Sequence, residues 1–267
     1  MMAGESERIN SDVWRSPEVL DIFAHRDGLI DPGEALLVRR IAEQADRRPI
    51  LDIGVGGGRT IPLLRSVTDE YVAVDYLEEM VTLARSRHPG VRIEQGDARD
   101  LSTFADDSFG AVFFSYNGID GISHEARRQV HASVRRVLQP GGVFGYSTHN
   151  LDYSAAGRPP WARSQWDVDN GLAAMASFAW RLPGRSRTYR RLRNLTVRGE
   201  GWALLVGSGY DFSVLWHHVS FDEARRELEQ AGFAPDVDVF DASAAPVQAG
   251  QDTSSSPWLY LIAREPA

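Results

Sequence analysis

Three aspartates are spaced so that one edge of a folded sheet could gather them. Asp52 lies just before the glycine-rich turn Gly54–Gly58, and Asp75 and then Asp97 follow at intervals of a little over twenty residues. Glycines let the backbone approach a bound molecule closely, and the amides at a helix N-terminus attract a negative group. An acid at the end of the second strand can accept hydrogen bonds from ribose hydroxyls. The spacing therefore predicts one crevice that could bind a negative group, such as a carboxylate, and the hydroxyls of a ribose.

Each of these features also has a purely structural explanation. The glycine turn could be only a tight connection between a strand and a helix, and Asp75 or Asp97 could cap a helix or form a turn. Arg59 stands where the nicotinamide-binding pattern G-x-G-x-x-G has its last glycine, which argues against a dehydrogenase.

The elements that must position these residues follow the rhythm of βα units. Short apolar runs alternate with amphipathic stretches at spacings of roughly twenty to twenty-five residues. The runs are Pro49–Ile53, Tyr71–Asp75, Val91–Gln95, Phe109–Ser115 and Gly142–Ser147. Glu78–Arg87 and Glu125–Leu138 show helical spacing, and Pro140-Gly141-Gly142 stops the second of these helices. Since ligands bind at the carboxyl ends of such parallel strands, the three acids should line one crevice.

The chain divides into four predicted parts. Residues 1–48 form an N-terminal helical arm or lid, residues 49–149 the ligand-binding core, residues 150–211 an inserted substrate cap, and residues 212–267 the C-terminal part of the core. In the last part, a capping box at Ser220 begins a helix between the strands Ser213–Val219 and Val237–Phe240, and Trp258–Arg264 is the final strand.

Composition excludes several chemistries. The 267 residues contain no cysteine, and all basic residues other than histidine are arginine, so disulfides, thiolate zinc sites and Schiff-base lysines are absent. A formal charge of −8 argues against a phosphate backbone as the main partner, and no apolar run is long enough to span a membrane. We expect a soluble, cytoplasmic protein, a monomer or homodimer, whose partner is a small molecule rather than a nucleic acid or a membrane.

Together, the motifs resemble the class I methyltransferases that use S-adenosyl-L-methionine. The resemblance rests on LDIGVGGGR, on VAVD followed by Tyr76, on the Gly96-Asp97-Ala98 turn, on AVFFSYNGID and on RRVLQPGGVF. It implies an α/β, Rossmann-like, doubly wound and mostly parallel seven-stranded sheet with an antiparallel last strand. It also implies S-adenosyl-L-methionine as cofactor and S-adenosyl-L-homocysteine as product.

The resemblance assigns roles by position. Asp52 and the glycine turn would hold the amino acid end of the cofactor, Asp75 the ribose, and Tyr76, Asp97 and Ala98 the adenine. Ser115 and Tyr116 would lie beside the methionine moiety. The full set implied to contact the cofactor is Asp52, Gly54, Gly56, Gly58, Arg59, Asp75, Tyr76, Met80, Asp97, Ala98, Ser115 and Tyr116.

Catalysis of methyl transfer mainly requires alignment, and a base where the acceptor loses a proton. His149, two residues beyond the fifth predicted strand, is the first candidate base, and Tyr116 and Asp120 are further catalytic candidates. Expected substrate contacts are Trp14, Asn117, His149, Tyr153, Trp166 and His217. No metal site is expected, because the histidines show no recognised ligand spacing. His217 and His218 alternate along a strand, so at most one can face the crevice.

Substrate choice is expected in the insertion, whose tryptophans 161, 166, 180 and 202 could form a lid over a flat acceptor or a small core of their own. The predicted reaction is methylation of O, N or an electron-rich carbon of a small aromatic metabolite, in bacterial natural-product tailoring. The arginine-rich stretch 181–198 leaves RNA or protein methylation as an alternative, although such a run is usually a solvated face. A non-methylating use of the cofactor also stays open.

Overall fold

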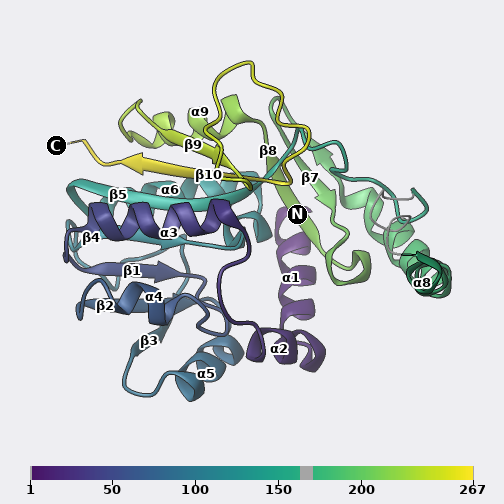
Figure 1. The fold of residues 1–267 in the computed structure, drawn as a ribbon, viewed down its shortest axis with the longest axis horizontal. Helices are drawn as coiled ribbons and strands as arrows, with labels where there is room; N and C mark the ends of the chain where they lie inside the picture. Colours follow the sequence, from purple (N-terminus) through teal and green to yellow (C-terminus); the bar gives the residue numbers. More distant parts are fainter. Residues whose placement is uncertain (1, 163–170, 267) are drawn as a thin grey trace.

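The computed structural model describes residues 2–162 and 171–266, which form a ten-stranded sheet flanked by helices (Figure 1). The core strands are β1 (Ile50–Ile53), β2 (Tyr71–Asp75), β3 (Arg92–Gln95), β4 (Phe109–Phe114), β5 (Leu138–Asn150), β9 (Asp238–Asp241) and β10 (Trp258–Arg264). The helices around them are α3 (Pro32–Ala45), α4 (Ile61–Arg65), α5 (Glu78–Arg87), α6 (His124–Val137) and α9 (Phe221–Ala231).

The sheet confirms the predicted α/β fold class. Strands β3, β2, β1, β4 and β5 lie side by side in parallel, and β10 pairs antiparallel with both β5 and β9. These are the seven strands expected. Three more strands extend the sheet: β6 (Val197–Arg198), β7 (Trp202–Val206) and β8 (Leu215–Val219). Strand β8 pairs in parallel with the end of β5, at His149 and Asn150.

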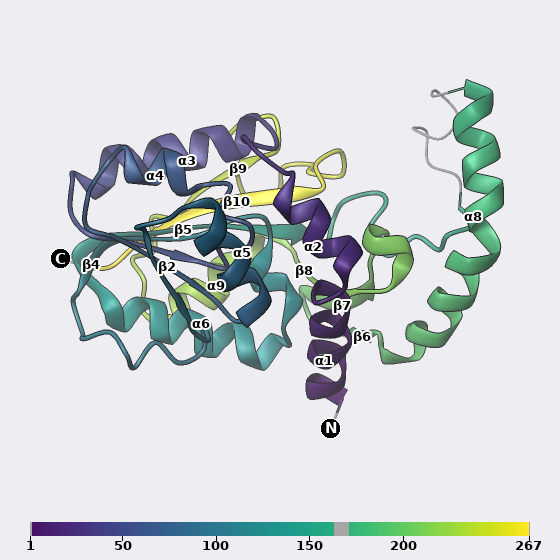
Figure 2. The same ribbon diagram turned by 90° about the horizontal axis from the view of Figure 1, so that it is seen from below.

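Alternation along the strands builds a hydrophobic layer on each face. Leu37 and Ile41 of α3 are buried against one face, while Val130 of α6 and Leu228 of α9 are buried against the other. Figure 2 shows α3 and α6 on opposite sides of the strands. Because the five parallel strands run in the same direction, their carboxyl ends lie together at one edge of the sheet.

The N-terminal arm crosses that edge. It contains α1 (Met2–Trp14) and α2 (Pro17–Ala24), whose N-cap is Ser16. The Asn10 side chain donates to the carbonyls of Gly121 (2.9 Å) and Leu215 (2.8 Å) and accepts from the Leu215 amide (2.9 Å). These buried hydrogen bonds tie the arm to the far part of the chain.

Helix α8 (Gly171–Leu192) stands at the end of the molecule opposite the C-terminus (Figures 1 and 2). It contacts the short helical turn Gly209–Phe212 and carries most of the arginine-rich stretch. Arg181 and Arg185 both pair with Asp211. Within the described residues, no helix combines the length and apolar character needed to cross a membrane.

Candidate functional site

A cavity of about 2030 Å³ opens at the carboxyl ends of the parallel strands. Gly54 and Gly56 of the glycine turn after β1 line this cavity, whereas Gly58 lies outside the lining; the φ values are +66° at Gly54, +54° at Gly56 and +82° at Gly58. Residues other than glycine rarely adopt these φ values, so the turn depends on its glycines. The predicted crevice therefore exists as a cavity.

Asp75 ends β2 inside this cavity and supports the turn. Its Oδ2 accepts from the Gly56 amide (2.8 Å) and its Oδ1 from the Leu77 amide (3.0 Å). Burial raises the pKa of Asp75 to about 6, against the opposing effect of these two amides. The carboxylate thus lies at the cavity wall with lone pairs left for a ligand's hydroxyl groups.

Asp52 lies beneath the turn and is absent from the cavity lining. Its Oδ2 accepts from Thr60 Oγ1 (2.8 Å) and Tyr71 Oη (2.7 Å), and its Oδ1 has no partner among the described residues. Burial raises its pKa to about 6, although Tyr71 and Thr60 oppose this shift. The side chain is placed to hold the turn from behind.

The other end of the crevice carries Tyr76, Met80, Asp97 and Ala98, all in the lining. Tyr76 is 49% exposed, whereas Met80 is buried. Both oxygens of Asp97 accept hydrogen bonds from Arg99, and Arg99 also donates to Glu7 of α1 at 2.8 Å. The predicted cofactor residues at this end are therefore gathered, with the Asp97 carboxylate already engaged by an arginine.

A strained turn follows β4. Ser115 is buried, and both Tyr116 and Asn117 adopt left-handed conformations, with φ of +53° and +56°. Such residues cost free energy and are often found at functional sites. Arg26 of the arm donates to Tyr116 Oη and lies over the Tyr116 ring, 4.7 Å from its centroid. Arg59, predicted to contact the cofactor, lines the cavity but forms a bidentate ion pair with Glu34 of α3.

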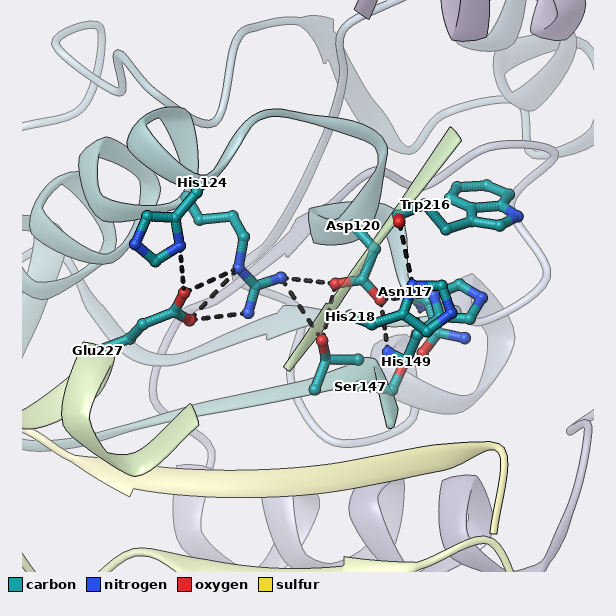
Figure 3. Close-up of polar contacts among 10 residues, drawn as sticks. Asn117, Asp120, His124, Ser147, His149, Trp216, His218 and Glu227 are labelled. Carbon is teal, nitrogen blue, oxygen red and sulfur yellow. Dashed lines mark hydrogen bonds and ion pairs between the residues drawn. The ribbon is translucent and has the colours of Figure 1, made fainter. Parts of the chain in front are cut away.

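His149 lies in β5 rather than beyond it, because the strand continues to Asn150 and pairs with β8. Asp120 Oδ2 accepts from both the His149 amide (2.6 Å) and His149 Nδ1 (2.7 Å), as Figure 3 shows. A proton on Nδ1 leaves Nε2 as the free acceptor on the ring. His149 lines the cavity with 13% of its side chain exposed. The structure thus pairs two of the predicted catalytic residues.

Asp120 itself is fully buried and is held from behind. Its Oδ1 accepts from Thr148 Oγ1 (2.7 Å) and Arg127 Nη1 (2.5 Å), and Arg127 Nη2 donates to Glu227 at 2.9 Å. Burial alone would raise the pKa of Glu227, but Arg127 outweighs it and the pKa lies below its ordinary value. Asp120, predicted as a catalytic candidate, is therefore absent from the cavity lining and lies behind His149.

Aromatic rings surround His149. Ring centroids of Trp216 and Trp258 lie 5.1 Å away and that of His218 lies 4.9 Å away, and Trp14 of α1 lies 5.8 Å from Trp216. Burial lowers the pKa of His218 to about 3, so this ring is neutral. These rings, with Asn117 and Tyr153, line the cavity. They form a flat-walled pocket around the His149 ring.

Of the predicted substrate contacts, Trp14, Asn117, His149 and Tyr153 line the cavity, whereas His217 does not. The pocket's tryptophans come from α1, β8 and β10 rather than from the insertion, where Trp180 is 86% exposed and Trp161 and Trp202 are outside the lining. Trp166 lies outside the described residues. His217 faces away from the cavity, and its neighbour His218 takes the inner position, because alternation puts them on opposite faces of β8.

Sequence reasoning missed Trp216, Trp258 and the Arg127–Glu227 pair, and it named His217 rather than His218 as the substrate contact. The two tryptophans and His218 reach His149 only through strand pairing, since Trp258 and His218 are its register partners in β10 and β8. Their aromatic or imidazole character was visible, but the pairing was not. The ion pair joins α6 to α9 across 100 residues of sequence, and no local pattern signals it.

Comparison with known proteins agrees with this geometry. Residues 50–142 match a family model described as a methyltransferase domain. A probable S-adenosylmethionine-dependent methyltransferase from Mycolicibacterium smegmatis is 31% identical over 123 residues, 46% of each chain. A phthiotriol/phenolphthiotriol dimycocerosates methyltransferase from Mycobacterium tuberculosis is 31% identical over 171 residues, 62% of this chain and 56% of that protein. The chain thus spans about half the length of these curated relatives.

Solved structures show the same fold at lower identity. An S-adenosylmethionine-dependent methyltransferase from Mesorhizobium loti aligns with a TM-score of 0.55 and 20% identity, covering 87% of this chain and 97% of its own. An amino pentose methyltransferase from Micromonospora echinaspora, solved with S-adenosylmethionine bound, aligns with a TM-score of 0.53 and 17% identity, covering 86% and 89%. These structures support the fold alone.

Proposed function

Because this chain belongs to the class I S-adenosylmethionine-dependent methyltransferases, we propose that it transfers a methyl group to O, N or an electron-rich carbon of a small aromatic acceptor. The observation that carries the proposal is the cavity itself. It joins the glycine turn and Asp75 at one end to the paired His149 and its aromatic walls at the other. A cofactor site and a candidate base therefore share one space.

The residues of the crevice fit the family's cofactor. Gly54 and Gly56, both with positive φ, line the cavity, and the buried Asn117 Oδ1 has no hydrogen-bond partner among the residues that the structure describes. Asp75 would accept the ribose hydroxyls, while the turn and Asn117 would meet the amino acid end. Tyr76 and Ala98 would flank the adenine.

The protein's part in the reaction is alignment and removal of a proton. The cofactor supplies an electrophilic methyl group bound to a sulfonium sulfur. His149 would accept the proton of an acceptor hydroxyl or amine at Nε2, and Asp120 would hold the resulting imidazolium through Nδ1. Trp216, Trp258 and Trp14 would stack on the acceptor ring and exclude water. A general base of this kind contributes about 10²–10⁴-fold in rate.

An acceptor of small size fits better than RNA or protein. Of the three arginines of α8 that line the cavity, Arg181 and Arg185 pair with Asp211, whereas Arg191 forms no ion pair within the described residues. The formal charge of −8 also opposes binding of a polyanion. The aromatic pocket around His149 supports a flat, mainly apolar acceptor, in keeping with tailoring of a metabolite.

The test combines binding and product mass. Calorimetry should detect S-adenosylhomocysteine binding to the full chain, and a panel of phenols, aromatic amines and indoles should give a product heavier by one CH₂ unit. His149→Asn should keep cofactor binding and lower kcat by about 10²–10⁴-fold, whereas His25→Asn, at an exposed position in the arm, should behave as wild type. Absence of cofactor binding would contradict the proposal, and turnover without the CH₂ gain would support a non-methylating role.

A further inference from the structure

Behind the sheet, away from the cavity, a second group of polar side chains converges. His124 begins α6, Glu227 lies in α9 and His217 lies in β8, so three separate elements contribute. One ligand-type atom from each lies within 4.8 Å of the other two. In Figure 3, His124 and Glu227 stand at the opposite end of the polar cluster from His149.

The spacing of His124 and Glu227 is that of two ligands of one ion. Nδ1 of His124 lies 3.3 Å from Glu227 Oε1, a distance that suits either an ion pair between the two groups or two ligands of one ion. In a tetrahedral zinc site with bonds of about 2.0–2.1 Å, neighbouring ligand atoms stand roughly 3.3–3.4 Å apart. The pair is therefore spaced for an ion between them.

His217 is the strongest sign of a missing partner. The residue is fully buried, and neither ring nitrogen has a hydrogen-bond partner within residues 2–162 and 171–266. A neutral imidazole always carries one N–H and one lone pair, so both would stay unsatisfied in a dry interior. Burial lowers the pKa of His217 well below its ordinary value, which keeps the ring in the neutral form that binds metals.

The charge balance also favours a cation. Arg127 is shared by two buried carboxylates, Asp120 and Glu227. One guanidinium against two ionised carboxylates leaves one negative charge that needs a second cation, either a bound metal ion or the His124 imidazolium, because an unpaired charge in the interior is costly. A divalent cation at Glu227 would offset it.

We propose that His124, His217 and Glu227 form a binding site for a divalent transition metal, with zinc the best fit. Two imidazoles and one carboxylate are a recognised zinc ligand set, and zinc needs a fourth ligand that water can supply. His124 is 23% exposed, which gives the ion and the water a route from solvent. The Trp202 ring lies 4.4 Å from the His124 ring and 5.3 Å from the His217 ring, and so covers the site. The ion would fasten α6 and α9 to β8, directly behind the Arg127–Asp120 support of His149.

The test measures zinc on the full-length protein after dialysis against a chelator. We expect one zinc per chain by elemental analysis and calorimetry, an absorption spectrum of four-coordinate cobalt when cobalt replaces zinc, and a rise in Tm on zinc addition. His217→Gln and His124→Gln should each weaken zinc binding by at least about 10–100-fold, since loss of an outer partner alone costs that much. His218→Gln, one residue along β8 on the opposite face, is the matched control and should bind zinc as wild type.

Two outcomes would overturn the site. One is the absence of saturable zinc or cobalt binding at equimolar concentration, in which case a protonated His124 balances Glu227 instead. The other is equal loss of zinc binding in the His218 control, which would place the metal in the cavity. Circular dichroism of each variant separates loss of a ligand from loss of the fold. S-adenosylhomocysteine binding is measured separately, so failure of this site leaves the proposed function untouched.

Discussion

The carboxylate of Asp120 holds His149 twice through one oxygen: Oδ2 lies 2.6 Å from the His149 amide and 2.7 Å from its Nδ1. The first contact fixes the backbone of β5 and the second fixes the plane and tautomer of the ring. Because Asp120 is fully buried and bonded to Thr148 and Arg127, it has no freedom to turn away. The Nε2 atom of His149 is therefore held at the cavity as an acceptor.

Asp120→Asn should test whether Asp120 orients the His149 ring without affecting cofactor binding. The asparagine amide can donate to Nδ1, which would move the ring proton to Nε2 and remove the acceptor from the cavity. We expect kcat to fall by about 10²–10⁴-fold while calorimetry gives an unchanged Kd for S-adenosylhomocysteine. Asp252→Asn, in an exposed loop, serves as control. A kcat close to that of wild type would show that Asp120 does not act through the ring.

Cofactor binding should depend on pH through Asp75. Burial raises its pKa to about 6, and only the ionised carboxylate offers all its lone pairs to ribose hydroxyls. Affinity for S-adenosylhomocysteine should therefore rise with pH and level off above pH 7. At pH 5, where the group is about 90% protonated, the Kd should be about tenfold weaker. Asp75→Asn should bind weakly at both values, and a wild-type Kd that is equal at pH 5 and pH 7 would contradict this role.

The sequence predicted the edge where the site forms but not everything that lies there. Asp75 and Asp97 follow strands of a parallel sheet, and parallel strands place their carboxyl ends together whatever the details of packing. The seven-stranded sheet was implied only by the resemblance to the methyltransferase family. Strands β6, β7 and β8 were not foreseen as one extension of the sheet, because β8 joins β5 through only two residue pairs far apart in sequence.

Long-range pairing also explains what was missed around His149. Trp258 and His218 reach it from two different strands, and alternation along β8 decided that His218 rather than His217 faces the cavity. To decide which of these two adjacent histidines faces the cavity, one must know the register of β8 in the sheet, and this register is set by tertiary structure. Arg127 is a similar case: a charged residue on a helix normally signals solvent, and only the approach of α9 buries it.

Helix α2 of the N-terminal arm packs so closely against the glycine turn that residue 57 has no room for a side chain. A Cβ on Gly57 would overlap the carbonyl oxygen of Phe23 in α2. Overpacking of this kind typically costs about 1–3 kcal/mol. Gly57→Ala should therefore loosen the arm, seen as faster proteolysis between residues 15 and 31 and weaker cofactor binding. Gly4→Ala, in the same arm with open space around it, should not. Equal protection in both variants would argue against this packing.

Replacement of the buried Arg127 should strongly affect the stability of the fold. Arg127→Met would leave Asp120 and Glu227 as unpaired buried charges, a change that typically costs about 3–5 kcal/mol. Arg127 holds the pKa of Glu227 below its ordinary value against the effect of burial, so the ion pair stabilises the fold at neutral pH and is lost only in acid, as the pH falls through that lowered pKa.

In the variant this dependence reverses, because the unpaired carboxylates would take up protons as the pH falls and shed their charge. Urea unfolding of Arg127→Met should thus show a large decrease in the free energy of unfolding at pH 7 and a smaller decrease at pH 5. Arg128→Met, at the next and half-exposed position of α6, should change stability by less than about 0.5 kcal/mol at either pH. If Arg127→Met lowered the free energy of unfolding by the same amount at pH 5 and pH 7, the loss would come from packing rather than from unpaired charge.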